Sequence, residues 1–148
     1  MCGYRANVLG VDVEVLEFQS SVDTVEKASQ LSGYEPGKIV KTLLLKAGGE
    51  YIVALVRGDR KLDLNSLSKT LGVEVSLAKA KEVKEVLKVD VGGVTPLSEE
   101  VLKLKIFLDE GILENEYVVC GGGDRRKLYK VKTEDLIRKL KPTLIQLT

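Results

Sequence analysis

Two apolar runs separated by a short polar turn constrain the fold of this chain more than any other feature. Residues 39–47 contain Leu43-Leu44-Leu45, and residues 51–57 contain Ile52-Val53-Ala54-Leu55-Val56. Only Gly48, Gly49 and Glu50 separate the two runs, which predicts a β-hairpin. Strands of such uniform apolarity are typical of positions buried on both faces of a sheet. The sequence therefore predicts a central hairpin with other elements packed on either side.

Shorter patterns surround this hairpin and give the order of the remaining elements. A capping box at Asp23–Glu26 predicts the start of a helix that ends at Gly33. Further helices are predicted at 64–71, closed by Gly72, at 79–88 with Ala80, Val83 and Leu87 inward, and at 133–140. Further strands are predicted at 13–18, 73–77, 105–108, 116–120 and 128–131, with an edge strand at 144–147. Without repeats or linkers, these patterns predict an α/β fold in a single domain, 1–148, with one mixed sheet and flanking helices.

The composition places the chain among ordinary globular proteins. Of its 148 residues, 44% are hydrophobic and 30% are charged. No apolar stretch approaches the roughly 20 residues of a membrane span, and the N-terminus lacks the features of a signal peptide. Cys2 and Cys120 are too few for a disulfide framework. We therefore expect a cytoplasmic protein that does not associate with membranes.

The charges are balanced overall but unevenly distributed. The net charge is +1, yet residues 9–26 carry five acidic residues and no basic one. Residues 124–141 carry eight basic residues against three acidic ones. This basic segment could attract RNA through its phosphates, or it could be an ordinary solvated surface.

The absence of histidine excludes several kinds of catalytic site. Ser-His-Asp and Cys-His pairs need an imidazole to accept the proton of the nucleophile. Zinc sites with histidine ligands are excluded, and two distant cysteines cannot form a four-thiolate site. A magnesium site made of carboxylates alone remains open, although no Asp/Glu cluster indicates one. We expect no metal and no cofactor, and we interpret Cys120 as a small buried hydrophobic residue.

Two further features have alternative interpretations. Gly121-Gly122-Gly123 is followed by strand-like residues 128–131 rather than by the helix that a phosphate-binding loop requires. The glycines then allow either a tight turn or the close approach of a ligand. Lys41 shares a predicted strand face with Leu43, so its ammonium either reaches the edge of the sheet or lies at the mouth of a pocket. Thr42 points to the opposite face.

Six short segments, in order, resemble the YbaK/prolyl-tRNA-synthetase-associated editing domain family. They are Lys38-Ile-Val-Lys41-Thr42-Leu-Leu-Leu, Val56-Arg-Gly-Asp-Arg60-Lys-Leu-Asp-Leu64, Val91-Gly92-Gly93-Val94-Thr95-Pro96-Leu97, Ile106-Phe107-Leu108-Asp109, Val119-Cys120-Gly121-Gly122-Gly123 and Asp135-Leu136. The resemblance spans about residues 12–148 and is to the free-standing members, which edit in trans.

The resemblance implies a strongly curved, barrel-like mixed sheet and a specific activity. Family members hydrolyse the ester that joins a mischarged amino acid to the 3′ end of a tRNA. The catalytic positions that it implies are Lys41 and the loop Gly92, Gly93, Val94, Thr95 and Pro96. The substrate-binding positions are Phe18, Thr42, Gly121, Gly122 and Gly123. Many members have a tyrosine near the end of the first strand, where this chain has Phe18.

These expectations combine into a mechanism without histidine, metal or cofactor. Backbone N–H groups of the 92–96 loop would stabilise the oxyanion, and Lys41 would hold a phosphate or ribose. Water, a ribose hydroxyl or the thiol of a cysteinyl substrate would be the nucleophile. The expected substrate is the aminoacylated 3′ acceptor end of tRNA, most readily tRNA-Pro carrying alanine, serine or cysteine, and prolyl-tRNA synthetase is an expected partner. The alternatives are a non-catalytic module that binds tRNA or protein, and a hydrolase of another small ester or amide.

Overall fold

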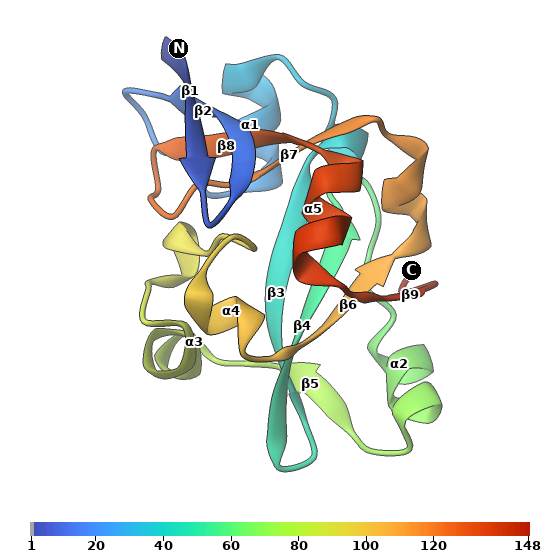
Figure 1. Cartoon of the computed structure of the whole chain (residues 1–148). Helices are drawn as coiled ribbons and strands as arrows, with labels where there is room; N and C mark the ends of the chain where they lie inside the picture. The colour runs from blue at the N-terminus through green and yellow to red at the C-terminus, as the bar shows by residue number, and fades with distance from the viewer. Residues whose placement is uncertain (1) are drawn as a thin grey trace.

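The computed structural model describes residues 2–148 and contains two β-sheets with helices around them (Figure 1). The strands are β1 (Cys2–Val8), β2 (Val11–Glu17), β3 (Val40–Ala47), β4 (Glu50–Arg57), β5 (Val75–Leu77), β6 (Lys105–Asp109), β7 (Tyr117–Gly121), β8 (Lys127–Lys132) and β9 (Thr143–Ile145). The α-helices are α1 (Val25–Ser32), α2 (Leu64–Leu71), α3 (Ala80–Leu87), α4 (Glu99–Leu102) and α5 (Thr133–Leu140). Short 3₁₀ helices are η1 (Pro36–Lys38), η2 (Val91–Gly93) and η3 (Glu110–Glu114).

The predicted central hairpin is confirmed. β3 and β4 pair antiparallel, and Ala47 lies opposite Glu50 across the two-residue turn. Gly48 in that turn has φ +61°, a value that glycine adopts without strain. The hairpin is central in a sheet of order β5-β3-β4-β6-β9, in which β9 is the predicted edge strand. Leu45, Val53 and Leu55 are fully buried.

The other sheet has the order β1-β2-β8-β7, and its first strand was not predicted. Residues of β1 are mostly exposed, so the strand lacks the apolar alternation by which an edge strand is recognised. It pairs with β2 through a tight turn in which Leu9 and Gly10 have φ of +51° and +89°. Hydrogen bonding to β2 therefore creates a strand where the side-chain pattern predicts none.

The sequence predicted one mixed sheet, whereas the structure divides the strands between two. A parallel bridge between Ile39 and Val119 connects the sheets where β3 begins and β7 runs past it. The largest core lies between them and includes Val13 of β2, Leu55 of β4 and Val118 of β7. The α/β class with flanking helices is confirmed, and the two sheets enclose the core without closing into a single barrel.

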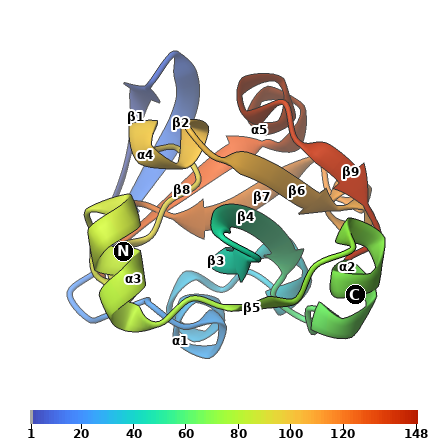
Figure 2. The ribbon, with the colours of Figure 1, turned by 90° about the horizontal axis from the view of Figure 1, so that it is seen from below.

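Helices cover both faces of the central hairpin, as its apolarity requires. Leu67 of α2 packs on the face that carries Leu45 and Val56, while α3 and α5 contribute to the core on the other face. Figure 2 shows α5 and α2 on different sides of the β3–β4 hairpin. Within residues 2–148, no helix has both the length and the apolarity needed to cross a membrane.

The helix ends follow their capping residues, with two corrections to the sequence prediction. α1 is capped by Thr24, whose hydroxyl accepts a hydrogen bond from the Lys27 N–H at 3.1 Å, rather than by Asp23. The helix ends at Gly33 as predicted. In α3, Val83 is buried as expected, but Ala80 is exposed because it begins the helix at its solvent side.

Candidate active site

The main candidate site is a cavity of about 490 Å³ beside β3. Its walls come from four parts of the chain: residues 22–28 at the start of α1, residues 39–44 at and just before the start of β3, the segment from Leu77 through α3 and η2 to Val94, and residues 120–128 around the β7–β8 turn. Figure 2 shows α1 and α3 on the same side of β3. Gly58, in the turn after β4, also lines it.

Thr42 presents a hydroxyl without a partner. The residue shares its strand face with Val40 and Leu44, which belong to the core between the sheets. Its Oγ1 atom is buried and has no hydrogen-bond partner within residues 2–148. A buried hydroxyl in this state costs free energy unless a ligand or water supplies the bond. Thr42 is therefore a candidate substrate contact, as the sequence analysis expected.

Lys41 points to the other face of β3, and its ammonium is held by the backbone. Its Nζ donates a hydrogen bond of 2.8 Å to the carbonyl of Arg60, in the segment that follows β4. This bond uses one of the three ammonium protons and leaves two N–H groups for a ligand. Lys41 also contributes to the wall of the cavity. Lys41 therefore lines the cavity as a residue, while the carbonyl of Arg60 fixes its ammonium.

Arg57 stabilises the turn next to Arg60, the residue whose carbonyl accepts the hydrogen bond from Lys41. Its guanidinium forms hydrogen bonds of 3.0 and 2.8 Å with both carboxylate oxygens of Asp59 and an ion pair of 2.5 Å with Glu114. The hydrogen bonds from Arg57 lower the pKa of the Asp59 carboxyl. The carbonyl that receives Lys41 is therefore adjacent to a turn fixed by charged contacts.

The predicted 92–96 loop contributes to the cavity only in part. Gly92 and Val94 line it, whereas Gly93, Thr95 and Pro96 are buried behind them. The N–H of Gly93 donates to the carbonyl of Asp90 at 2.8 Å, so it is already used. The candidate oxyanion donors in this loop are therefore the N–H groups of Gly92 and Val94.

The three consecutive glycines have separate roles. Gly121 lines the cavity, and a Cβ at this position would lie 2.0 Å from the carbonyl oxygen of Val94. Glycine is thus required for the 92–96 loop to lie against β7. Gly122 is buried and donates its N–H to the Lys127 carbonyl, and Gly123 has φ +85°. Neither Gly122 nor Gly123 lines the cavity, so their role here is to shape the turn.

Two other residues singled out from the sequence do not supply reactive groups to the cavity. Phe18 packs in the small core near α1 and lines a separate hollow with Gln19 and Leu31. Cys120 forms part of the cavity wall, but burial raises the pKa of its thiol to about 12. The thiol is therefore protonated at neutral pH and behaves as a small hydrophobic group.

The contribution of α1 and Gly58 to the cavity was not predicted from the sequence. A Cβ at Gly58 would lie 2.8 Å from Val25 Cγ1 and 2.7 Å from the carbonyl oxygen of Pro36. Glycine there allows the first turn of α1 to approach the end of β4 and form one wall. The Gly58-Asp59 pair was recognisable only as a turn, since the contact with α1 bridges more than 30 residues of sequence.

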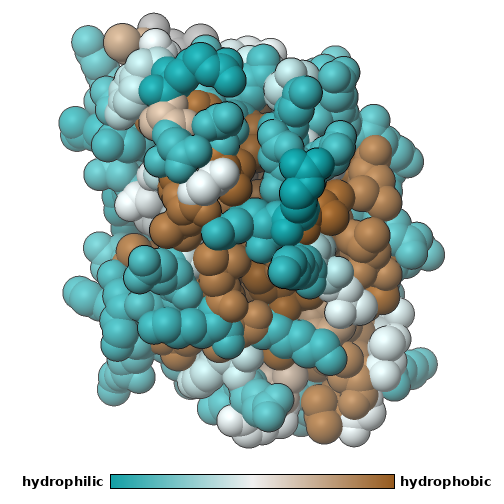
Figure 3. Space-filling model, in the orientation of Figure 1, coloured by the Kyte–Doolittle hydropathy of each residue, from teal (hydrophilic) through white to brown (hydrophobic). Residues whose placement is uncertain are grey.

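Within residues 2–148, three of the eight basic residues of the segment 124–141 form ion pairs. Arg125 pairs with Asp23 at 2.7 Å, Lys127 with Glu17 at 3.7 Å, and Arg138 with Glu134 at 2.8 Å. Hydrophilic and hydrophobic residues are interspersed on the face that carries α5 (Figure 3). Within residues 2–148, no group of three or more Cys, Asp or Glu side chains is arranged to hold a metal ion.

Comparisons with known proteins identify the family. Residues 19–139 match the aminoacyl-tRNA editing domain family. Proline--tRNA ligase of Thermoanaerobacter sp. (strain X514) is 31% identical over 97% of this chain, and that of Maridesulfovibrio salexigens is 32% identical over 81%. These matches cover 27% and 23% of the two ligases, so this chain spans about a quarter of the length of these curated relatives.

Solved structures give the same result. A crystal structure described as a candidate trans-editing enzyme for prolyl tRNA synthetase has a TM-score of 0.84 and 29% identity, covering 92% of this chain and 86% of its own. The crystal structure of the protein APE2540 has a TM-score of 0.82 and 29% identity, covering 91% and 90%. The residues that match the family, 19–139, include the cavity-lining strand β3 and the loop around η2. This chain belongs to the aminoacyl-tRNA editing domain family.

Proposed function

We propose that this chain hydrolyses the ester between a small mischarged amino acid and the 3′ end of a tRNA, acting in trans in the cytoplasm as a single editing domain. The observation that carries the proposal is the Thr42 hydroxyl, which has no partner within residues 2–148 and belongs to a residue of the cavity that Gly92 and Val94 also line. Membership of the editing family supports the reaction class, and similarity to proline--tRNA ligases supports tRNA-Pro as the substrate.

The size and lining of the cavity suit an aminoacylated terminal nucleoside. Pockets of about 300–1,000 Å³ enclose small organic ligands, and this cavity measures about 490 Å³. Leu44, Val83 and Cys120 give it an apolar wall. This wall favours alanine, serine or cysteine and leaves little room for a bulky side chain.

The charges around the cavity also fit such a substrate. Lys41 and Lys127 line it together with Glu26 and Asp124. An aminoacyl ester carries an α-ammonium on the amino acid and a phosphate on the 5′ side of the terminal nucleoside. We assign the phosphate or ribose to Lys41 and the α-ammonium to the carboxylates.

The reaction needs no side-chain nucleophile. A water molecule adds to the ester carbonyl carbon, and the N–H groups of Gly92 and Val94 donate to the oxyanion that forms. The bond to the ribose oxygen then breaks, and this oxygen takes up a proton, which releases the free amino acid and deacylated tRNA. One oxyanion donor contributes about 2.7–4 kcal/mol, and orientation of the reactants contributes up to about 7–11 kcal/mol.

The test is a deacylation panel with purified protein. tRNA-Pro carrying radiolabelled alanine, serine, cysteine, proline or phenylalanine is incubated with the protein, and ester loss is compared with the rate in its absence. We expect acceleration for alanine, serine and cysteine, with alanine slightly favoured because the wall formed by Leu44, Val83 and Cys120 is apolar. Rapid loss of phenylalanine would contradict the small pocket. No acceleration with any ester by folded protein would favour a non-catalytic module that binds tRNA or protein.

A further inference from the structure

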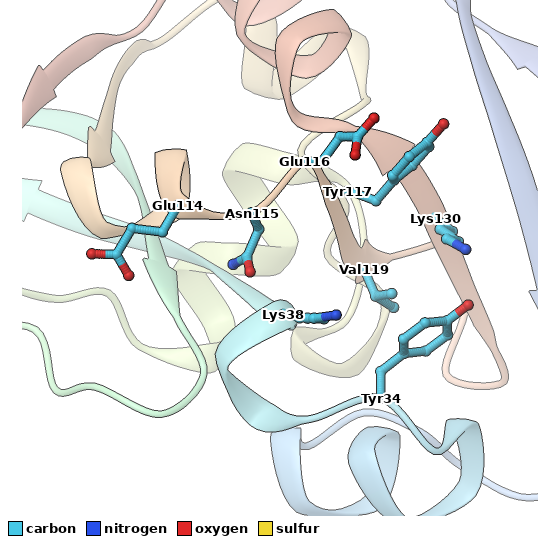
Figure 4. A pocket seen from close by; sticks show the side chains of 8 residues that line it. All are labelled: Tyr34, Lys38, Glu114, Asn115, Glu116, Tyr117, Val119 and Lys130. Atoms are coloured by element: carbon cyan, nitrogen blue, oxygen red, sulfur yellow. The ribbon is translucent and has the colours of Figure 1, made fainter.

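A second hollow, of about 330 Å³, lies on the opposite face of β7 from the candidate active site (Figure 4). Val119 lines this hollow, whereas its neighbour Cys120 lines the active-site cavity. Successive side chains of a strand point to opposite faces, so β7 separates the two spaces. Lys38, at the end of η1, lines the second hollow and lies next to Ile39, which lines the first.

Two tyrosine rings and a lysine form one side of this hollow. The Nζ of Lys130 lies 5.3 Å from the ring centroid of Tyr34 and 5.3 Å from that of Tyr117. Figure 4 shows Lys130 between the two rings, with Val119 behind them. Tyr117 is 42% exposed, so its ring is open to a ligand. Glu14 is the register partner of Lys130 on β2, but it forms no ion pair with it in the described chain.

The hollow carries two ammonium groups and few opposing charges. Lys38 points into it from the side away from Lys130 (Figure 4), and within residues 2–148 neither lysine forms an ion pair. Glu114 also lines the hollow, but its carboxylate turns outward to Arg57 at 2.5 Å. The carboxylate of Glu116 points away from the centre of the hollow in Figure 4. The facing groups are therefore cationic and aromatic.

Asn115 adds a group that can read the edge of a planar ligand. Its Nδ2 donates to the carbonyl of Gly37 at 2.8 Å, which leaves its side-chain oxygen as a free acceptor. Aromatic faces, lysines that pair with phosphates and an amide are the groups that bind single-stranded nucleic acid. A peptide carboxylate would use the lysines but would leave the exposed ring of Tyr117 without a stacking partner.

We propose that the hollow between Tyr34, Tyr117 and Lys130 binds an unpaired nucleotide of the tRNA. A base stacks on Tyr117, and its phosphate pairs with Lys130 and Lys38. The identity of the RNA as tRNA rests on the proposed function, whereas the binding of an unpaired nucleotide does not. The protein then holds its substrate at two points, the aminoacyl end in one cavity and a second nucleotide in the other.

Binding is measured by fluorescence anisotropy with two RNA probes that carry no amino acid, a fluorescein-labelled pentamer of adenylate and deacylated tRNA-Pro. The variants are Tyr117→Leu, Lys130→Ala and Lys38→Ala. Because Lys38 is exposed, its replacement is not expected to affect folding. Matched controls are Tyr4→Leu, an equally exposed strand tyrosine, and Lys69→Ala on α2. Circular dichroism and the thermal midpoint verify that each variant is folded.

Loss of a stacked base weakens binding by about 5- to 150-fold, so Tyr117→Leu is expected to raise the Kd of both probes within this range. Removal of one phosphate contact is expected to lower the slope of log K against log salt by about 0.7. The controls are expected to change the Kd less than twofold. Unchanged affinity in the folded Tyr117 and Lys130 variants, or no binding of either probe by the wild type, overturns the proposal. Loss of affinity for prolyl-tRNA synthetase with RNA binding intact would assign the hollow to a protein instead.

The two proposals fail separately in this design. The anisotropy experiment uses RNA without an attached amino acid, so it measures RNA binding at the hollow whether or not the protein hydrolyses an ester. If the wild type deacylates tRNA but the Tyr117 and Lys130 variants bind RNA as the wild type does, the proposed activity stands and the proposed nucleotide site is refuted. If these variants lose RNA binding but the wild type does not deacylate tRNA, the proposed activity is refuted and the proposed nucleotide site is supported.

Discussion

Replacing Thr42 with valine tests whether the cavity is built for a ligand at the expense of stability. The side chains have nearly the same shape, but valine removes the buried Oγ1 that has no partner within residues 2–148. An unsatisfied buried hydroxyl costs about 1–3 kcal/mol. Each kcal/mol shifts the thermal midpoint of a chain of this size by about 2–4 °C. Thr42→Val is therefore expected to raise the midpoint by at least about 2 °C.

The same substitution is expected to impair deacylation. If the hydroxyl bonds to the substrate, its loss removes about 0.5–1.5 kcal/mol of binding, which corresponds to about a 2- to 13-fold fall in kcat/KM. Stability and activity then change in opposite directions, which a merely structural threonine would not produce. The measurements are thermal unfolding followed by circular dichroism, and steady-state deacylation of alanyl-tRNA-Pro.

Thr95→Val is the matched control for stability. Thr95 is also buried, but its Oγ1 accepts a hydrogen bond of 3.2 Å from the Leu97 N–H. Valine at this position leaves that N–H unpaired, so the midpoint is expected to fall. An unchanged or lowered midpoint for Thr42→Val would show that its hydroxyl is satisfied in the free protein. Unchanged kcat/KM would show that it does not contact the substrate.

Three further predictions concern other residues of the cavity. Lys41→Ala is expected to reduce kcat/KM at least tenfold with the midpoint within a few degrees; near-normal turnover of folded variant would reject its role. Gly92→Val is expected to damage turnover more than folding, because Gly92 lines the cavity and its added side chain would meet only the side chain of Arg125; a folded, fully active variant would make the loop only a turn. Cys120→Ser is expected to retain most activity, also in EDTA. Burial raises the pKa of the Cys120 thiol from 9.0 to about 12. The stability that the neutral thiol gives the wild type is therefore present below pH 9 and is lost as the pH rises from 9 to about 12. In denaturant titrations, the free energies of unfolding of the wild type and of Cys120→Ser should approach each other over this pH range.

The central hairpin was predictable because consecutive apolar residues indicate burial on both faces of its strands. Leu43-Leu44-Leu45 needs no partner to be recognised as buried. β1 was not predictable, since Cys2–Val8 is held by its pairing with β2 and not by apolar side chains. The division into two sheets depends on the bridge between Ile39 and Val119, a contact between residues 80 positions apart in the chain. Local patterns contain no information on such a contact.

For the candidate site too, the sequence predicted only what local patterns determine. Alternation along β3 correctly separates Lys41 from Thr42, because the two residues must face opposite ways. It cannot reveal that the Lys41 ammonium reaches the carbonyl of Arg60, 19 residues later. Nor can it show that Phe18 lines a different hollow from the cavity, since that depends on how the segment around α1 packs.

The glycines of the site explain why its shape resists prediction from sequence. At Gly121 a Cβ would lie 2.0 Å from the Val94 carbonyl oxygen, and at Gly58 it would lie 2.7 Å from the Pro36 carbonyl oxygen. Both distances are shorter than any real Cβ contact, so the backbones on either side of the cavity are closer than an alanine would permit. A site formed in this way presents main-chain groups to a ligand at fixed positions, and such fixed donors stabilise an oxyanion without reorganising. The proposed mechanism without histidine fits this arrangement, because its candidate oxyanion donors, the N–H groups of Gly92 and Val94, belong to a backbone that Gly121 allows to lie close to β7.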